Sequence, residues 1–559
     1  PTPTDLNSLA VHLGARLHAN TLGGQVGAIR VGPGVLKTRT RPAARIAFRP
    51  PRHPMRGQVP FLTTPTGPGC DCVRASILHH TLHQWAYSSE IEGASVHVGL
   101  ETPPSARRTE PRSKLHGWGH AATRSEPIPN ETSMNRIVAS IACSCLFQMC
   151  TTAQPHEVWL FDQSDTRPGG GGGTLYIYDG ADVEGNNAAR ARPEVIDLGG
   201  AISDLAVAQT RTVPVRPHMF FFNRSETYGV LAYVASGHVL FIEAATRTPV
   251  AFIDVGLQAH AAFPAANEAY VIVANQNGKT VHRILTDYAE GNFALDPSAT
   301  LDLVAGLTPN GLPKEHPMLR PDNAPICLNL DSSSRYAFVT LRGGGLFVVD
   351  VTTTPMSIVA EYDKDVIHPN GCIGIEAAGK MYVNSGGGSA PNPYESDLYS
   401  FNLADFSPVA APPNLPTATL VFSRDALGVA DSHGGVLTGH SRYLWMADRA
   451  ANLISVVDTR SDKVLNEFSL LGRSSLDPTP DLLGISPSGN RVYAALRGPN
   501  PLTGNNPTVN NAAGATPGLG IIRVMQSGRH GYLQAVAPVS RVIGGVERAD
   551  PHAIGVRSK

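Results

Sequence analysis

Short runs of alternating apolar and polar residues recur from residue 155 to the end of the chain. Each run is rich in Val, Ile, Ala or Leu and has a tyrosine near its start or centre. This alternation is typical of β-strands that bury one face. Six such runs are Leu231–Ala235, Ala269–Asn275, Arg335–Thr340, Lys380–Asn384, Arg442–Asp448 and Arg491–Ala495.

These runs mark a repeated structural unit. Their tyrosines are 37, 66, 46, 61 and 50 residues apart, and a further apolar strand ending in Asp comes next, as in Leu346–Asp350 and Leu453–Asp458. Such spacings fit one four-stranded blade per tyrosine, with insertions of different length. The sequence therefore predicts an all-β fold with six explicit blades, which we number 2 to 7.

The two ends of this region supply the remaining blade, blade 1. Pro551–Arg557 has the pattern of a first strand but no second strand comes after it, whereas Glu157–Phe161 and Thr174–Asp179 lack a first strand. Pairing these segments closes a ring and removes the free sheet edges that an open array would expose. We expect a seven-bladed β-propeller, closed by the C-terminal strand, over residues 154–559.

Two segments carry a resemblance to a known family. Ile485–Tyr493 and Pro551–Ile554 resemble the repeat of YVTN/lactonase-like β-propellers, and the resemblance extends over about residues 155–557. It implies the propeller fold. Because propellers of this family have many functions, the resemblance alone does not select an activity.

The segment before the repeats differs in composition. Residues 1–133 contain 15 Lys and Arg against 8 Asp and Glu and show no apolar periodicity, so we expect a disordered or non-native upstream extension. Residues 134–153 begin with Met134 and Arg136, continue with an apolar stretch and end in small residues. This pattern is typical of a secretory signal peptide, with a buried helix as the alternative. We expect an extracytoplasmic protein, periplasmic or secreted.

Composition excludes several functional classes. The chain has 45 Lys and Arg, 46 Asp and Glu, and a mean hydropathy of −0.08, and it contains no run of 18 apolar residues. We therefore expect no transmembrane anchor in the mature chain. The sequence also lacks the G-x-S-x-G motif of serine hydrolases and the H-E-x-x-H motif of zinc proteases. It has no basic face with interleaved aromatic residues, so we expect no nucleic-acid partner.

The candidate chemistry lies in the first strands of the blades, which line the channel of a propeller. Alternate residues of a strand face the same side, so residues at even offsets in aligned first strands share the channel. One position of the aligned first strands is occupied by His260, Cys327, Cys372 and His433. The position two residues earlier in the alignment is occupied by Asn370, Asp431 and Asp481. His368 lies four residues earlier, and His218 and His552 fall near the position of Asp481. We expect these side chains to converge.

Imidazoles that converge from separate strands can bind a transition metal, and histidine with cysteine favours copper or zinc over magnesium or calcium. The predicted ligands are His218, His260, His368, His433 and His552. Copper is the first expectation, with zinc or no metal as alternatives. In the structural alternative, each imidazole only bonds the backbone of a neighbouring blade. Cys327 and Cys372 form a disulfide, remain thiols or act as ligands.

The arrangement resembles, in kind only, the His-lined copper channels of nitrous oxide reductase and thiocyanate dehydrogenase. This resemblance implies copper chemistry. The chain departs from the first enzyme because Asp481 stands where that enzyme has His and no cupredoxin domain follows. A full tetranuclear cluster is therefore not expected, whereas a site with one, two or three ions remains open.

Polar residues at the ends of the tyrosine strands suggest the substrate. Arg342, Arg449 and Arg497 follow three of these strands at similar distances, and Asn275 and Asn384 add amides on the same face. Guanidinium groups bind oxyanions through two hydrogen bonds, so we expect a small anionic substrate. The alternative is that each arginine forms a solvated turn or a salt bridge between blades.

Three functions are consistent with these observations. The first is a copper-dependent oxidoreductase acting on a small anion, in which Asp481 or Asp431 is a ligand or proton acceptor. The second is a lactonase-like hydrolase, in which a channel His or Asp activates water and Arg stabilises the oxyanion. The third is a non-catalytic propeller that binds protein or glycan. The sequence does not identify a redox partner.

Overall fold

The structure is a computed structural model that describes residues 154–386, 396–406, 416–424, 429–502 and 512–559. The predicted upstream extension, residues 1–133, and the predicted signal peptide, residues 134–153, lie outside the described residues.

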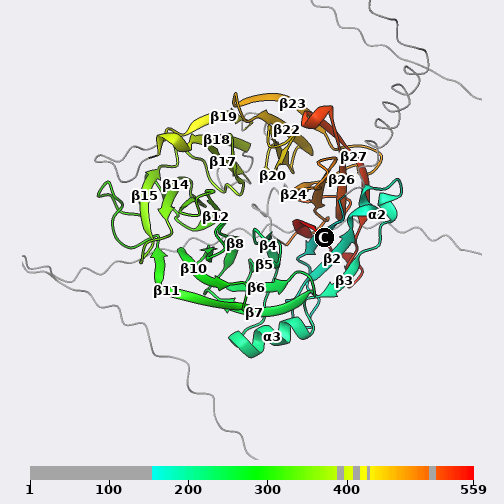
Figure 1. The fold of residues 1–559 in the computed structure, drawn as a ribbon, viewed down its shortest axis with the longest axis horizontal. Helices are drawn as coiled ribbons and strands as arrows, with labels where there is room; N and C mark the ends of the chain where they lie inside the picture. The colour runs from blue at the N-terminus through cyan, green and yellow to red at the C-terminus, as the bar shows by residue number, and fades with distance from the viewer. Residues whose placement is uncertain (1–153, 387–395, 407–415, 425–428, 503–511) are drawn as a thin grey trace, which may run out of the picture. The chain divides into compact units, whose positions relative to one another are not determined.

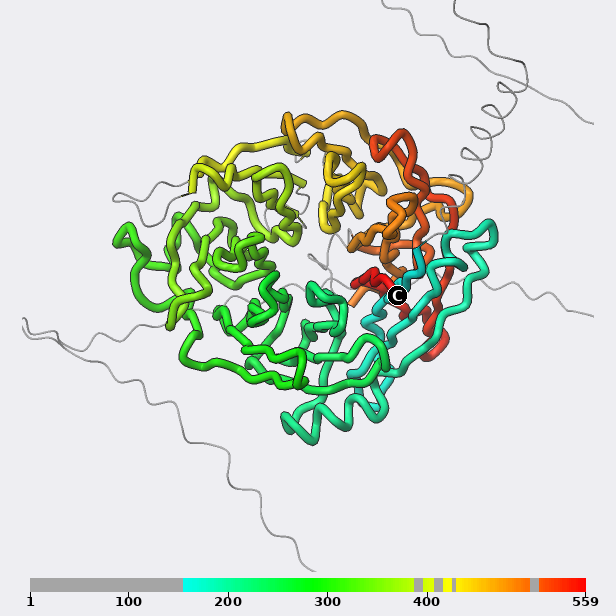
Figure 2. Tube along the Cα trace, viewed as in Figure 1, coloured from blue at the N-terminus to red at the C-terminus, as the bar shows by residue number. Residues whose placement is uncertain are grey.

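Seven four-stranded antiparallel sheets surround a central axis like the blades of a propeller (Figures 1 and 2). This confirms the predicted all-β, seven-bladed fold. Blade 1 contains β1 (His156–Asp162), β2 (Thr174–Asp179), β3 (Glu194–Asp197) and β30 (Pro551–Ser558). Blade 2 contains β4 (Pro217–Phe222), β5 (Tyr228–Tyr233), β6 (His238–Glu243) and β7 (Thr248–Asp254). Blade 3 contains β8 (Ala259–Pro264), β9 (Tyr270–Asn275), β10 (Thr280–Asp287) and β11 (Asn292–Asp302).

The remaining blades come in chain order. Blade 4 contains β12 (Pro325–Leu330), β13 (Tyr336–Leu341), β14 (Leu346–Asp350) and β15 (Ser357–Tyr362). Blade 5 contains β16 (Gly374–Ala377), β17 (Lys380–Gly386), β18 (Ser396–Asn402) and β19 (Thr419–Ser423). Blade 6 contains β20 (Ser432–Thr438), β21 (Tyr443–Asp448), β22 (Leu453–Asp458) and β23 (Lys463–Ser469). Blade 7 contains β24 (Pro480–Ile485), β25 (Arg491–Leu496), β26 (Gly518–Met525) and β27 (His530–Pro538).

Only short elements lie outside the blades in the described ranges. They are the helices α2 (Gly180–Glu184) and α3 (Ala201–Thr210), three 3₁₀ turns (Ala188–Arg190, Leu403–Asp405 and Gln526–Gly528), and the hairpin of β28 (Val542–Ile543) and β29 (Val546–Glu547). Helix α3 packs beside β7 at the outer edge of blade 2 (Figure 1). No helix among the described residues is long and apolar enough to cross a membrane.

The ring closes through blade 1, as the sequence predicts. Strand β30 pairs with β1 in antiparallel register, with Ile554 opposite Leu160 and Val556 opposite Val158. The last residue adds a backbone bond, because the amide of Lys559 donates to the carbonyl of Pro155 at 2.9 Å. Both ends of the propeller are therefore held in one sheet, which pairs the strand edges that an open array would expose.

Apolar side chains pack between neighbouring blades. Trp159 of β1 is fully buried and stacks on Phe220 of β4, with ring centroids 5.6 Å apart. Each buried aromatic side chain of this size contributes roughly 1.5–3 kcal/mol or more through the hydrophobic effect. The core is thus a series of contacts between adjacent blades that fixes each inner strand relative to the next.

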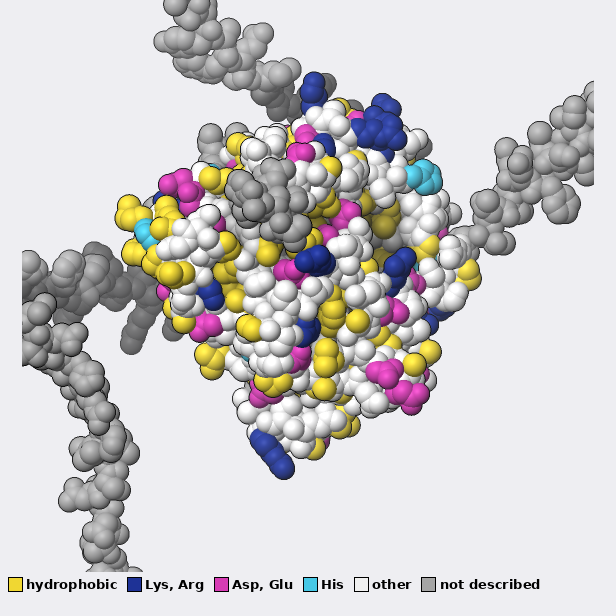
Figure 3. All heavy atoms as spheres, turned by 60° about the vertical axis from the view of Figure 1, so that its left-hand side comes forward, with side chains coloured by type: hydrophobic (Ala, Val, Ile, Leu, Met, Phe, Trp, Pro, Cys, Tyr) yellow, Lys and Arg dark blue, Asp and Glu magenta, His cyan; other side chains and the backbone are white. Residues whose placement is uncertain are grey.

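The inner strands β30, β4, β8, β12, β16, β20 and β24 contact one another in that order and complete a ring around the axis. The outer surface is mixed in character: on the face in Figure 3, basic and acidic side chains are interspersed among apolar ones. Because the inner strands form this ring, the predicted histidines and Asp481 that they carry face a common channel.

Candidate metal centre in the central channel

Five predicted site residues occupy one equivalent position. His218, His260, His433, Asp481 and His552 are each the second residue of an inner strand, in β4, β8, β20, β24 and β30 respectively. The pairing of each of these strands with its neighbour shifts register at or near this point. A β-bulge re-aims the side chain beside it, so the repeated irregularity marks the level at which the groups converge.

Three of these side chains meet around one point. The Nε2 atom of His433 lies 3.3 Å from Oδ1 of Asp481, and Nε2 of His552 lies 3.7 Å from the same oxygen. The three atoms all lie within 4.8 Å of one another. All three are buried and have no hydrogen-bond partner among the described residues. Buried polar atoms are normally bonded, so three unbonded atoms that face each other indicate a site for a cation or ligand.

The hydrogen bonds around His552 fix its tautomer. Its Nδ1 atom lies 3.0 Å from the backbone carbonyl of His218, which can only accept a hydrogen bond. Nδ1 therefore carries the proton, and Nε2 presents a lone pair toward Asp481. Burial lowers the pKa of His552 to about 3 and holds the pKa of His433 well below its usual value. Both imidazoles are therefore neutral, as a metal ligand must be.

A second pair of imidazoles lies beside this triad. His218 stacks on His552 with ring centroids 3.7 Å apart, and its Nε2 atom lies 3.3 Å from Nε2 of His260. Gln163 donates from Nε2 to Asp550, so its Oε1 faces Nδ1 of His218 at 3.0 Å. His218 thus donates from Nδ1 and presents the lone pair of Nε2 to His260.

Two buried arginines hold the carboxylate of the triad. Arg497 donates from Nη1 to Oδ2 of Asp481 at 2.6 Å and from Nη2 to Oδ2 of Asp550 at 2.9 Å. Arg449 donates from Nε to Asp431 at 2.6 Å, and its Nη1 lies 3.4 Å from Oδ2 of Asp481. These bonds occupy Oδ2 of Asp481 and leave Oδ1 directed at the two histidines.

The same ion pairs set the charge of the site. Burial alone raises the pKa of Asp481, but the neighbouring imidazoles and guanidinium groups outweigh burial and hold that pKa below its usual value. Burial raises the pKa of Asp431 to about 7, although Arg449 opposes the shift. Arg449 and Arg497 face three buried carboxylic groups, Asp431, Asp481 and Asp550.

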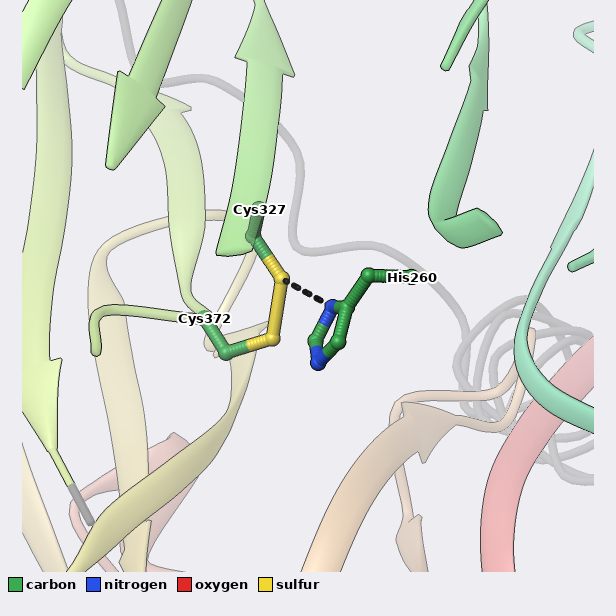
Figure 4. A group of neighbouring side chains, drawn as sticks. All are labelled: His260, Cys327 and Cys372. Carbon is green, nitrogen blue, oxygen red and sulfur yellow. Dashed lines mark hydrogen bonds between the residues drawn. A yellow bond between two sulfur atoms is a disulfide. The ribbon is translucent and has the colours of Figure 1, made fainter. Parts of the chain in front are cut away.

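Cys327 and Cys372 form a disulfide between neighbouring blades (Figure 4). Their Cα atoms are 5.0 Å apart, within the range that a disulfide requires. Of the three predicted states, the structure shows the bridge. Figure 4 shows the imidazole of His260 against it, with Nδ1 3.9 Å from Sγ of Cys327. The bridge therefore forms the wall of the channel next to His260.

His368 belongs to neither group of close ligand atoms found among the described residues. Its side chain is 40% exposed, and Nδ1 lies 2.7 Å from Oδ2 of Asp397. The segment before β16 explains this position, because His368 precedes the strand and Asn370 has a left-handed backbone with φ of 61°. The alternation of a strand does not extend to it.

The residues predicted to bind an anion are bonded within the fold. Asn275 donates to the carbonyl of Val255, and Asn384 accepts from the amides of Cys372 and Ile373. Arg449 and Arg497 are 2% and 0% exposed, whereas Arg342 is 38% exposed and bonds Asp322 at 2.6 Å. Substrate binding by these five residues remains a prediction.

Sequence reasoning missed two members of the network, Gln163 and Asp550. Asp550 carried a signal, because it precedes Pro551 and His552 as Asp431 precedes Ser432 and His433. Asp431 bonds Arg449, which follows the second strand of its own blade. Asp550 bonds Arg497, which follows the second strand of the preceding blade. Gln163 follows β1 in a loop and gave no comparable signal.

No family model and no curated protein sequence matches the chain. Solved structures with a similar fold include a putative 6-phosphogluconolactonase from Bacteroides fragilis, with 12% identity and a TM-score of 0.44 over 73% of this chain and 99% of that chain. Others are a Lactobacillus plantarum protein, with 10% identity and a TM-score of 0.46, and a Pseudomonas aeruginosa periplasmic gluconolactonase, with 13% identity and a TM-score of 0.45. Each of these two matches covers 72% of this chain and 99% of the other. At this identity the likeness concerns the fold alone.

Proposed function

We propose that the channel binds one divalent transition-metal ion and that the protein is a metal-dependent hydrolase of small cyclic esters. The ligands are Nε2 of His433, Nε2 of His552 and Oδ1 of Asp481. The observation that carries the proposal is the convergence of these three buried atoms from three separate blades, unbonded within the described part of the chain. Two histidines with one carboxylate form the ligand set of several catalytic zinc sites.

The spacing of the ligand atoms fits such an ion. Ligands about 2.0–2.1 Å from a tetrahedral zinc ion lie about 3.3 Å from one another. The observed separations from Oδ1 of Asp481 are 3.3 Å to His433 and 3.7 Å to His552. The carboxylate of Asp481, whose pKa lies below its usual value, adds attraction for a cation, since a buried charge is stable only when it is paired.

The neighbouring residues of the chain would prepare the site for the ion. The carbonyl of His218 orients His552, and Arg497 with Arg449 holds Oδ2 of Asp481 so that Oδ1 remains available. Such outer contacts fix the direction of metal ligands and raise metal affinity. A bound zinc ion supplies a Lewis acid and lowers the pKa of a bound water molecule toward 7. Hydrolysis of an ester needs both effects.

The resemblance of the blade repeat to lactonase-like propellers selects lactones as the first esters to test. A lactone is already cyclic and strained, so attack by water at its carbonyl opens the ring without loss of a fragment. We further propose an extracytoplasmic location. The Cys327–Cys372 disulfide supports it, because structural disulfides persist mainly in oxidising compartments.

Metal content tests the proposal directly. The full-length protein is treated with a chelator, dialysed, reloaded with Zn²⁺, and analysed by elemental mass spectrometry and by hydrolysis of glucono-δ-lactone and δ-valerolactone. We expect one zinc ion per chain and turnover that requires it. His552→Gln should weaken zinc binding on the order of 100-fold or more. His282→Gln is the matched control, because His282 is a partly buried histidine on β10 that bonds Thr280 and Thr300.

The result divides the alternatives. If the folded protein retains no stoichiometric metal at micromolar Zn²⁺, the proposed metal site is refuted. A protein that binds one ion but hydrolyses neither these lactones nor alkyl-substituted δ-lactones keeps the site and loses the reaction.

A copper oxidoreductase is the second candidate, and one observation favours it. His218 and His260 face each other through Nε2 atoms 3.3 Å apart, directly beside the triad. Imidazole groups suit copper, and this pair extends the ligand set to four histidines. The test is the copper content after reloading with Cu²⁺. Two or more copper ions per chain, reduced to one in His218→Gln, would favour this candidate over a single zinc ion.

A further inference from the structure

An apolar cavity of about 330 Å³ lies in the central channel beside the metal centre. This volume is at the lower end of the range of small-molecule sites. Inner strands of all seven blades and the residues next to them form its wall. The main apolar side chains are those of Phe221, Phe263, Ile373, Ile375, Leu482 and Ile554.

The cavity lies next to the metal centre along the inner strands, and its wall begins one or two residues after the proposed ligands. Leu482 follows the proposed ligand Asp481, Ile554 is two residues beyond His552, and Gly435 is two residues beyond His433. Cys372 belongs to the cavity wall and is bridged to Cys327, whose sulfur lies 3.9 Å from His260. A molecule in the cavity therefore has one end next to the metal centre.

The other end of the cavity leads toward the surface. Ile485 and Val556 line both the cavity and a wide groove of about 1220 Å³. Turns at residues 439–443 and 486–490 form much of that groove. The shared residues place the groove, the apolar cavity and the metal centre in sequence along the channel.

One polar group in the wall lacks a partner within the described ranges. Asn329 is 3% exposed and lines the cavity, and its Nδ2 atom has no hydrogen-bond partner there. Its side chain lies across Gly374, where an added Cβ atom would fall 1.5 Å from Cγ of Asn329. A glycine at 374 is therefore what allows the amide to occupy the channel wall. An unbonded buried donor in an apolar cavity indicates a ligand that brings an oxygen acceptor.

We infer that this cavity binds the alkyl chain of the substrate, so that the substrate class is a lactone with an aliphatic side chain bearing an oxygen acceptor. The inference rests on the proposed function, because the metal centre at the inner end would act on the ring. At about 30 Å³ per water-sized group, the volume accommodates a chain on the order of ten carbon atoms. Sugar lactones, which are polar throughout, would not fill it.

Binding of 1-alkanols tests the cavity without any reaction. Calorimetric titration of the full-length protein with 1-butanol, 1-hexanol and 1-octanol should show an affinity gain of about fourfold per added methylene. Ile375→Phe places a larger ring in the cavity, so the affinity gain should stop at a shorter chain than in the wild type. Leu420→Phe is the matched control in the outer strand of the same blade, where Leu420 is 54% exposed, and should leave the gain unchanged.

A second variant protects the test against misfolding. Ile375→Ala enlarges the cavity and should extend the affinity gain beyond the wild-type limit of about ten carbons, measured with 1-decanol and 1-dodecanol. Equal affinity for all chain lengths in the wild type would overturn the inference, as would an unchanged series in both Ile375 variants.

The same series in lactones separates this inference from the proposed function. With the zinc-loaded protein, kcat/KM should rise about fourfold per methylene from δ-valerolactone to δ-octalactone, δ-decalactone and δ-dodecalactone, until the cavity is full. Chain-length-dependent alkanol binding without lactone turnover would overturn the hydrolase and leave the cavity assignment standing. Lactone turnover that is independent of chain length, together with flat alkanol binding, would overturn the cavity assignment and leave the hydrolase standing.

Discussion

Replacement of Arg497 by methionine should destabilise the propeller strongly. Arg497 follows β25 in blade 7 and is completely buried. It bonds Asp481 of its own blade and, through two guanidinium nitrogens, Asp550, which precedes the closing strand β30. Burial lowers the pKa of Arg497, but Asp550 and Asp481 outweigh burial and raise it, so the side chain stays charged.

The magnitude can be worked out from the charges left behind. Methionine has a similar length, so the main loss is the positive charge rather than volume. Removal of one partner of a buried ion pair typically costs about 3–5 kcal/mol, because the remaining charge is buried without compensation. With a urea slope of about 3 kcal/mol/M, such a loss lowers the unfolding midpoint by about 1–1.7 M.

Arg342→Met is the matched control. Arg342 follows β13 of blade 4 at the position equivalent to Arg497, and it bonds Asp322. Arg342 is 38% exposed and Asp322 is 29% exposed, so solvent screens this pair and its loss should cost about 0–1 kcal/mol. Urea unfolding monitored by tryptophan fluorescence measures both variants against the wild type.

The double variant Arg497→Met/Asp550→Asn should recover part of the loss, since it removes one of the two uncompensated carboxylates. Equal midpoints for Arg497→Met and Arg342→Met would refute the conclusion that the buried network stabilises closure of the ring.

Two further predictions concern the channel. Burial lowers the pKa of His260 to about 4 and that of His552 to about 3, below the ordinary value of 6.5, so each contributes full stability above pH 6.5 and loses about 1.4 kcal/mol per pH unit as the pH falls below it. The pKa values of His218 and His433 are lowered in the same way, and these four imidazoles outweigh Asp431, whose pKa of about 7 acts in the opposite direction. The urea midpoint of the chelator-treated protein should therefore be lower at pH 5 than at pH 7, and equal midpoints would contradict this. Reduction of the Cys327–Cys372 bridge, which spans 45 residues, should cost about 4 kcal/mol of stability in the wild type and nothing further in Cys327→Ser. Equal urea midpoints with and without dithiothreitol in the wild type would contradict the bridge.

Much of the fold could be predicted from the sequence because each blade repeats one local pattern. Buried tyrosines such as Tyr233, Tyr382 and Tyr493 recur in the second strands, where alternation distinguishes the two faces. The unpaired pattern of Pro551–Arg557 predicted the pairing of β30 with β1. These features depend on local periodicity and on the number of strands, both of which a sequence records.

The site was harder to predict because its register is irregular. Counting alternate residues placed His433 and Asp481 two positions apart in the blade, whereas both are the second residue of their inner strand. Bulges in β20 and β24 lie beside them. A bulge adds one residue to one strand, so a strict period of two fails at the level where these side chains meet. The burial of Arg497 could not be predicted either, because one of its partners, Asp481, belongs to blade 7 and the other, Asp550, precedes the closing strand of blade 1.

Closure of the ring and assembly of the site use the same residues. The network runs from Asp481 through Arg497 to Asp550 and then to Gln163, which orients His218. These bonds join the last blade to the strand that completes blade 1. The atoms of the triad come from blades 6, 7 and 1, so they are in register only when the ring is closed. A cation bound there would link three blades and add its binding free energy to the stability of the closed propeller. Zinc binding and ring closure should therefore be coupled, and a metal-dependent increase in stability should shrink in Arg497→Met.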